Sequence, residues 1–279
     1  MNIYDVSEHA GVSIATVSRV LNGNPNVSEK TREKVLKVMD DLGYTPNVFA
    51  RGLGLNTMQT IGIMCSDSSD PYLAGAIYYL ERGLRSHNYD AILCCTGYDL
   101  DAKQKYFELL RSKRVDAIIL AGSKFVEMRP KDNAYITEAA SELPIMLVNG
   151  YLEGDNIYST VCDDHAAMYG AASQLLKAGR RRILYLYTSY SYSGVNKLEG
   201  YKDALKAYGM APCDELNIIG YNNSILSQCT DPEITSIDSK VEALCTTTIN
   251  TLMGVFSGVN VPSRTTIASD LIKRKTTNF

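Results

Sequence analysis

Residues 3–22 read IYDVSEHAGVSIATVSRVLN, and their pattern predicts the structure of the N-terminal part of the chain. Gly11 lies where a turn needs a residue that tolerates a left-handed backbone, and Ser13 follows it as a natural N-cap for a second helix. The flanking apolar residues have the spacing that two short, steeply crossed helices require: Val6, Ala10, Val17, Val20 and Leu21. The pattern predicts a helix-turn-helix, which places its second helix in the DNA major groove.

The second helix has another face that its packing does not explain. This face holds Ala15, Ser18, Arg19 and Asn22, three or four residues apart along the helix. Because these side chains suit base edges and phosphates, we expect a recognition helix. The alternative is an ordinary helical hairpin in some larger core. Ser28 then caps a third helix that ends at Gly43, which completes a three-helix headpiece.

The composition is that of a globular chain with a small headpiece and a larger domain. The 279 residues are 45% hydrophobic and 21% charged, and the formal net charge is −3. Residues 1–57 contain six basic and six acidic side chains, so nonspecific attraction to DNA should be modest. The seven cysteines have no metal-site spacing, and no apolar run suits a secretion signal or a membrane span. We therefore expect a cytoplasmic protein without a metal or another cofactor. We also find no catalytic motif, so we do not expect an enzyme.

From residue 59 onward, short β-rich runs alternate with helical stretches. This alternation predicts a parallel, doubly wound α/β sheet, in which ligands bind at the carboxyl ends of strands. The expected strands are 60–64, 91–95, 117–121, 145–149, 160–162 and 183–187, and the expected helices are 71–87, 103–111, 135–141, 166–178 and 194–208.

Much of the chain resembles the LacI/GalR family of bacterial transcription regulators. The likeness covers residues 4–53, then IGIMCSDSSDPYLAGAIYYLERGL (61–84), VDAIILAG (115–122), LLKAGRRRILYL (175–186), IIGYNN (218–223) and LIKRKTT (271–277). It implies an all-α headpiece (1–46), a hinge (47–58) and an α/β periplasmic-binding-protein-like domain (59–279). That domain would contain two doubly wound parallel-sheet subdomains, at about 59–150 with 238–256 and at about 151–237 with 257–279.

The resemblance also implies roles for residues of the headpiece and hinge. We expect Arg19 to reach guanine through its two-pronged guanidinium group, while the apolar tips of Ile14 and Ala15 contact thymine methyl groups. Leu53 stands at the position of the wedge residue with which this family unstacks a base step; the alternative for the hinge is a plain linker. Candidate contacts to the DNA backbone are Tyr4, Ser13, Thr16, Ser18, Asn22, Ser28, Thr31, Asn47, Ala50 and Arg51.

A small effector is implied by the same resemblance. Asp70 and Tyr72 match positions that line the effector cleft. Lys197 stands where the family usually has an arginine, and Asn222 stands where it usually has an aspartate. The alternatives are a solvated helix residue for Lys197 and a turn residue for Asn222. We interpret the acids of Asp163-Asp164-His165 as helix-terminus residues rather than as a metal site.

After Gly209 the chain reaches IIGYNN too soon for the family pattern. About two βα units of roughly 25–30 residues each are absent, so the second subdomain is expected to be incomplete. The leading hypothesis is a dimeric repressor that binds a pseudo-palindromic operator and responds to a sugar or related metabolite. The alternatives are an effector-blind or degenerate variant and a cytosolic solute-binding protein.

Overall fold

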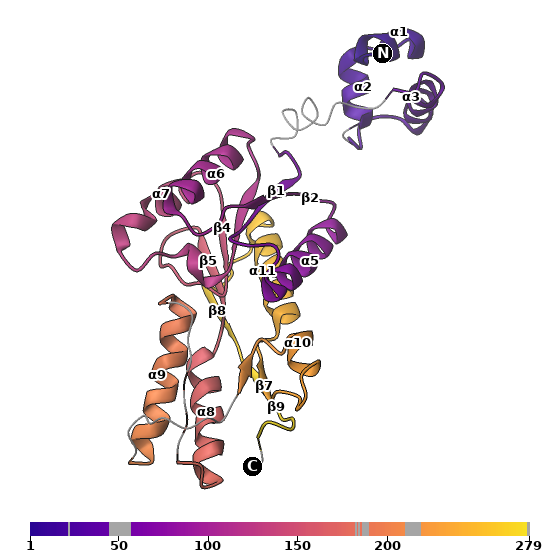
Figure 1. Cartoon of the computed structure of the whole chain (residues 1–279). Helices are drawn as coiled ribbons and strands as arrows, with labels where there is room; N and C mark the ends of the chain where they lie inside the picture. Colours follow the sequence, from indigo (N-terminus) through magenta and orange to yellow (C-terminus); the bar gives the residue numbers. More distant parts are fainter. Residues whose placement is uncertain are drawn as a thin grey trace. The chain divides into compact units, whose positions relative to one another are not determined.

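The computed structural model describes residues 1–21, 23–44, 57–181, 183, 185, 190–209 and 219–277. The chain divides into two compact units, Met1–Thr60 and Ile61–Phe279, which are drawn in Figure 1. None of the helices in these described ranges is both long enough and apolar enough to cross a bilayer.

The first unit is the expected three-helix headpiece. Its helices are α1 (Ile3–Ala10), α2 (Ile14–Leu21) and α3 (Glu29–Asp41). Gly11 ends α1 with φ at 59°, the left-handed conformation that the turn was expected to need. The core consists of four of the predicted apolar residues, Val6, Ala10, Val17 and Val20, together with Val35 and Met39 of α3, and Leu21 packs against it partly buried.

The second unit contains a six-stranded sheet with the strand order β2-β1-β3-β4-β5-β8. The pairs β1–β3, β3–β4, β4–β5 and β5–β8 are parallel, with Ile61 opposite Ala117 and Ile118 opposite Ile145. The strands are β1 (Thr60–Cys65), β2 (Asp90–Cys95), β3 (Ala117–Ala121), β4 (Ile145–Val148), β5 (Ile157–Cys162) and β8 (Arg264–Ile267). The order changes direction at β1 and β3, and in open α/β sheets such a switch point is where ligands bind.

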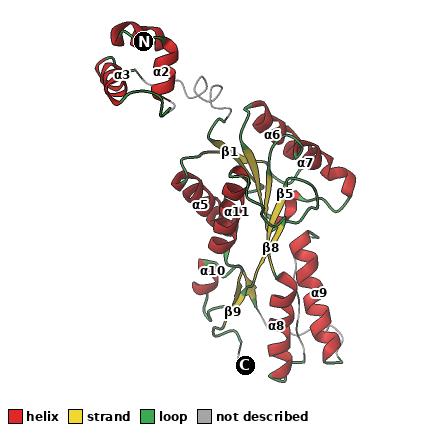
Figure 2. Ribbon diagram, turned by 180° about the vertical axis from the view of Figure 1, so that it is seen from behind, coloured by secondary structure: helices red, strands yellow, loops and turns green. Residues whose placement is uncertain are grey.

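Helices cover both faces of this sheet, as Figures 1 and 2 show. Side chains alternate along β3, so Ile119 packs beneath one pair of helices and Ile118 beneath the other. The helices are α5 (Pro71–Ser86) and α11 (Val241–Phe256) on one face, and α6 (Leu100–Ser112) and α7 (Ala134–Ala139) on the other; two 3-10 turns, η1 (Ser123–Phe125) and η2 (Pro130–Asn133), precede α7. We call this sheet with its helices the first lobe.

The second lobe is smaller. Its sheet has the order β6-β7-β9, formed by β6 (Gly220–Tyr221), β7 (Ser236–Asp238) and β9 (Asp270–Ile272). Helices α8 (Asp164–Lys177) and α9 (Tyr192–Ala207) lie side by side in both views, and α10 (Ile225–Gln228) is a single turn. Where a parallel sheet was predicted, β6 and β7 pair parallel but β7 and β9 pair antiparallel, because β9 enters the sheet directly from the first lobe.

Three short links join the two lobes in the described chain. They connect β5 to α8, β7 to α11 and β8 to β9, and each contains only one or two residues. Lys240, in the second link, forms an ion pair of 2.6 Å with Asp270 at the start of β9 and lies 4.0 Å from Asp238. The Lys240 side chain therefore connects the second link to the strand that follows the third.

The predicted elements correspond closely to the observed ones from residue 60 to residue 208. The expected strand at 183–187 falls largely outside the described residues. Both β5 and β8 pair in the six-stranded sheet, although the expected subdomain bounds assign their residues to the second subdomain. This difference arises because the chain crosses between lobes after each of these strands, not before it.

Candidate functional site

The outward face of α2 is accessible to solvent. Ile14 is 38% exposed, and Ala15 and Arg19 are also exposed, while Ser18 is half-buried. Val17 and Val20, on the opposite face of the same helix, are buried against the other two helices. The headpiece therefore presents the predicted base-reading side chains on a rigid support, as a recognition helix requires.

Two of the candidate phosphate-contacting serines cap helices. The Ser13 hydroxyl accepts a hydrogen bond from the Thr16 backbone N–H at 3.1 Å, and Ser28 accepts one from Thr31 N–H at 3.3 Å. In each case the two hydroxyls also bond to each other, at 2.9 Å and 2.8 Å. These four residues stabilise the starts of α2 and α3 whether or not DNA is bound.

The other candidate contacts of the headpiece and hinge divide into two groups. Tyr4 is 66% exposed at the start of α1 and can reach a partner outside the headpiece. The remaining predicted contacts lie outside the described residues: Asn22, Asn47, Ala50, Arg51 and Leu53. Sequence reasoning did not identify Arg32, whose guanidinium group donates to the carbonyls of Val20 and Asn24 and so ties α3 to the end of α2.

Asp70 and Tyr72 lie at the switch point of the six-stranded sheet. Asp70 is the N-cap of α5, and its carboxylate accepts hydrogen bonds from the Tyr72 and Leu73 backbone N–H groups at 2.9 Å and 3.0 Å. The Tyr72 hydroxyl is buried without a hydrogen-bond partner among the described residues. Burial raises the pKa of Tyr72 well above its usual value, and nearby charges including Asp164 raise it further.

Lys197 belongs to a buried cluster in the second lobe. Its Nζ lies 3.8 Å from Asp164 Oδ1 and 3.6 Å from the centre of the Tyr221 ring. The Tyr221 hydroxyl donates to the same Asp164 oxygen through a short hydrogen bond. Burial lowers the pKa of Lys197, and the Asp164 carboxylate opposes this effect. Asp164 is 1% exposed, and its other oxygen, Oδ2, has no partner in the described part of the chain.

The N-terminus of α9 makes contacts with the first lobe close to this cluster. The Ser191 hydroxyl, which caps α9, hydrogen bonds to the Ser123 hydroxyl at 2.9 Å. Arg264 of β8 donates to the Tyr192 hydroxyl at 2.7 Å, and its guanidinium carbon lies 4.7 Å from the centre of the Tyr151 ring. The junction of the lobes is therefore lined by tyrosines and hydroxyl groups.

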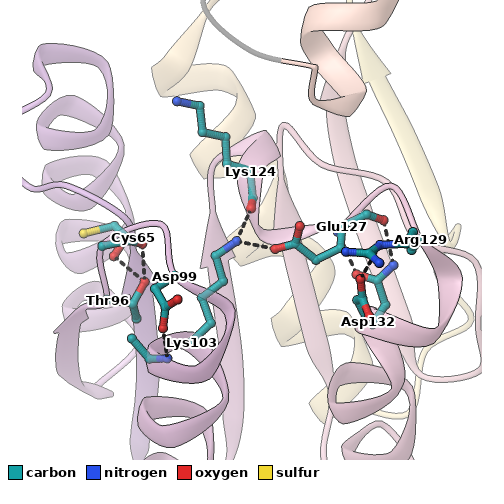
Figure 3. A network of polar contacts seen from close by, with 11 residues as sticks. Cys65, Thr96, Asp99, Lys103, Lys124, Glu127, Arg129 and Asp132 are labelled. Carbon is teal, nitrogen blue, oxygen red and sulfur yellow. Dashed lines mark hydrogen bonds and ion pairs between the residues drawn. The ribbon is translucent and has the colours of Figure 1, made fainter.

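A buried lysine fixes the loop that carries Ser123 (Figure 3). Lys103 of α6 donates from Nζ to the Lys124 carbonyl at 2.5 Å and to Glu127 Oε1 at 2.6 Å. The Glu127 backbone is held in turn by the Asn133 side chain. Because each of these bonds restrains residues 124–127, Ser123 is held in a defined position beside α9.

Sequence reasoning identified this junction only in part. Asp164 lies in the first turn of α8, as its interpretation as a helix-terminus residue predicted, but it also lies 3.8 Å from Lys197, and its charge raises the pKa of Tyr72. Its neighbour Asp163 does cap α8. Asp164 follows β5 directly, and its position at the carboxyl end of a strand is the signal that could have identified it. Asn222 occupies the turn after β6 with φ at 73°, so its turn-forming role is visible in the structure.

Family models match most of the chain. Residues 2–47 match "Bacterial regulatory proteins, lacI family", and residues 58–271 match "Periplasmic binding proteins and sugar binding domain of LacI family". An HTH-type transcriptional regulator of Lachnoclostridium phytofermentans is 56% identical over an alignment of 334 positions that covers all of both chains. Catabolite control protein A of Priestia megaterium is 30% identical, over 94% of this chain and 80% of that protein.

Solved structures share the same fold. A Lac repressor dimer bound to its operator and an anti-inducer superposes with a TM-score of 0.87, at 21% identity, over 99% of this chain and 98% of that one. The transcriptional regulator CelR in complex with cellobiose superposes with a TM-score of 0.68, at 20% identity, over 99% and 100% of the two chains. With its helix-turn-helix headpiece and its two-lobed α/β unit, this chain belongs to the LacI family of DNA-binding transcription regulators.

Proposed function

We propose that this regulator is a repressor that binds a pseudo-palindromic operator as a homodimer. The observation that carries the proposal is the exposed face of α2, where Ile14, Ala15 and Arg19 project opposite a packed core. A two-fold dimer presents two such helices to symmetric half-sites, which produces a palindromic target. The operator-bound Lac repressor dimer, which has the same fold, supports this arrangement. A protein with this role shares a compartment with the chromosome, so we place it in the cytoplasm.

Within this function, Arg19 reads guanine, and Ile14 and Ala15 contact thymine methyl groups. Ser18 and the hydroxyls at the starts of α2 and α3 contact phosphates, which fix the register of the protein on the duplex. The hinge contributes the contacts of Asn47, Ala50 and Arg51 and the wedge of Leu53, by resemblance to the family.

Selection from random duplex DNA tests this function. We expect enrichment of one pseudo-palindromic sequence, with an affinity that falls as salt rises. Arg19→Lys keeps the charge but loses the two-pronged donor, so it should reduce discrimination at one guanine by about 10-fold to 100-fold while leaving the salt dependence unchanged. If no sequence is enriched, or if the palindrome is recovered equally well with Arg19→Ala, the assignment of base reading to α2 is wrong.

We also propose that a sugar-like effector binds at the junction of the lobes. Tyrosine rings suit the apolar faces of a neutral sugar, and hydroxyl groups such as that of Tyr72, which has no partner among the described residues, suit its hydroxyls. The unpartnered oxygen of Asp164 requires a donor, because a buried carboxylate oxygen without one is costly. Among the described residues the carboxylate has one ion-pair partner, Lys197, whose ammonium group also lies over the Tyr221 ring. This pairing favours a polyhydroxyl ligand over an anionic one.

Calorimetry with neutral sugars, nucleosides and sugar phosphates tests the effector. We expect micromolar binding of a neutral sugar that Asp164→Asn weakens at least tenfold. Asp203→Asn is the matched control, because Asp203 lies on α9 with an exposed side chain and pairs with His165. Binding that is unchanged in Asp164→Asn would exclude this site.

The apparent shortening favours one alternative, an effector-blind regulator. The alignment with the 56% identical relative has 334 positions, which is 55 more than the 279 residues of this chain. That difference equals the size of two βα units, the number that the sequence pattern suggested. If the whole panel gives no heat while operator binding persists, the effector-blind alternative is correct. Sugar binding without operator binding would instead support the solute-binding alternative.

A further inference from the structure

Two cysteines lie side by side at the ends of neighbouring strands. Cys65 is the last residue of β1, and Cys95 is the last residue of β2. Their sulfur atoms are 3.6 Å apart. The Thr96 backbone N–H donates to the Cys65 carbonyl at 2.9 Å, which fixes the two strand ends in this alignment (Figure 3).

The two thiols have very different access to solvent. Cys65 is fully buried in the core beneath α5 and α11, whereas Cys95 is exposed on the edge strand. Cys94 is buried on the opposite face of the sheet, beneath α6 and α7. A reagent in solution therefore reaches Cys95 first, and the product formed there is already in contact with the Cys65 thiol.

We propose that Cys65 and Cys95 are a thiol oxidation site, at which hydrogen peroxide drives formation of an intrachain disulfide. In the first step the Cys95 sulfur attacks the peroxide oxygen, the O–O bond breaks, and Cys95 becomes a sulfenic acid with release of water. In the second step the Cys65 sulfur attacks the Cys95 sulfur, the S–O bond breaks, and a second water leaves. The two thiols together lose two electrons and two protons, and the peroxide is reduced by the same two electrons. This site depends on no assumption about DNA or effector binding.

The strand geometry permits this bond. Neighbouring strands lie about 4.8 Å apart, which is inside the range of roughly 4.4–6.8 Å that disulfides require between Cα atoms. The sulfurs must approach from 3.6 Å to a bond length of about 2.05 Å, a movement that side-chain rotation can supply. Burial raises the pKa of the Cys65 thiol to about 12, so Cys65 is a poor first nucleophile and its attack is the slower second step.

The bond would restrain the part of the first lobe that leads to the proposed effector site. Cys65 precedes the turn that reaches Asp70 and the start of α5, and Cys95 precedes the turn that reaches Asp99, the N-cap of α6. Since β2 is an edge strand, it is held by β1 alone within the sheet. A covalent link at its end should therefore slow hydrogen exchange along β2 in the oxidised protein.

The test treats the full-length protein with hydrogen peroxide and maps peptides under non-reducing conditions. We expect a Cys65–Cys95 peptide, a loss of two hydrogen atoms from the intact mass, and reversal by dithiothreitol. Cys229→Ser should behave like the unmodified sequence, because it removes another exposed thiol. Cys95→Ser should abolish the crosslinked peptide, and it is the informative variant because the exposed site tolerates serine; Cys65→Ser should instead leave Cys95 as a trappable sulfenic acid.

Three results would overturn the proposal. The first is oxidation of Cys95 to sulfinic acid with no crosslink while Cys65 stays reduced. The second is a disulfide between the Cys95 residues of two copies, seen as a covalent dimer on non-reducing gels. The third is crosslinking of Cys95 to Cys94 rather than to Cys65. Hydrogen exchange of β2 that is the same in the oxidised and reduced proteins would remove the proposed restraint even if the bond forms.

Discussion

Replacement of Glu127 by alanine would leave the Lys103 ammonium group in the interior without its carboxylate. The side chain of Lys103 is 2% exposed and that of Glu127 is 30% exposed, so the two members of this pair are not equivalent. Loss of the carboxylate leaves a buried charge whose remaining acceptor in this pair's surroundings is the Lys124 carbonyl, and breaking a buried pair in this way typically costs about 3–5 kcal/mol. Loss of the ammonium group in Lys103→Met instead leaves a carboxylate that can hydrate, and the methionine keeps most of the buried chain, so we expect about 1–2 kcal/mol.

Calorimetric unfolding of the full-length protein measures this asymmetry. The transition of the second unit is the one to follow, because the headpiece is a separate compact unit and the chain need not unfold in one step. At roughly 2–4 °C per kcal/mol for a unit of this size, Glu127→Ala should lower the midpoint by about 10 °C and Lys103→Met by only a few degrees. The double variant should be more stable than the sum of the single effects predicts, because it removes both charges together.

A surface pair supplies the control. Arg85 and Glu81 lie 2.8 Å apart on α5 with side chains that are 70% and 43% exposed, so Glu81→Ala should cost no more than about 0.5 kcal/mol. If Lys103→Met destabilises the protein as much as Glu127→Ala does, exposure does not decide the cost, and the argument from burial is refuted.

Three further predictions concern packing, capping and pH. A Cβ atom at Gly200 would lie 2.3 Å from the His165 carbonyl, so Gly200→Ala should separate α8 from α9 and lower the calorimetric midpoint by several degrees; Gly170→Ala, which has open space, should not, and equal midpoints would contradict the close approach. Ser28→Ala removes the cap of α3 and should cost the headpiece about 1 kcal/mol by circular dichroism, with Ser28→Gly losing less; an unchanged midpoint would mean that the cap contributes nothing. The hydrogen bond from Arg111 holds the pKa of Glu142 below its usual 4.5, so this contribution is complete above about pH 4.5 and is lost as the pH falls through the lower folded-state pKa; Glu142→Gln should flatten that acid limb in a pH titration of stability, and an unaltered limb would exclude the effect.

The sequence predicted the headpiece well because its signals are local. The turn glycine, the two serine caps and the apolar spacing each act within a few residues, and the structure places all of them as expected. The same is true of β3, whose observed bounds match the prediction. In contrast, β6, β7 and β9 contain only two or three residues, which is too short for an alternating pattern to be recognised. These strands exist because distant segments supply their partners.

The candidate effector site was harder to predict for a related reason. Asp70 and Lys197 were identified through family resemblance, but the carboxylate that organises the buried cluster, Asp164, was not. Its importance depends on Tyr221, which lies 57 positions further along the chain, and no local pattern reports that contact. The contacts of Ser191 and Tyr192 with the first lobe are equally invisible in the sequence, since they need both lobes to be folded.

The three short links between the lobes, with Lys240 of the second paired to Asp270 just after the third, have a mechanical consequence. Three short connections side by side allow the lobes to bend about one axis more easily than to slide or twist against each other. We therefore expect the lobes to move mainly by opening and closing on the side that carries the first turn of α9. Lys240→Met removes the ion pair with Asp270 and should make this bending easier, while the DNA-reading helix and the first turn of α9 stay unchanged.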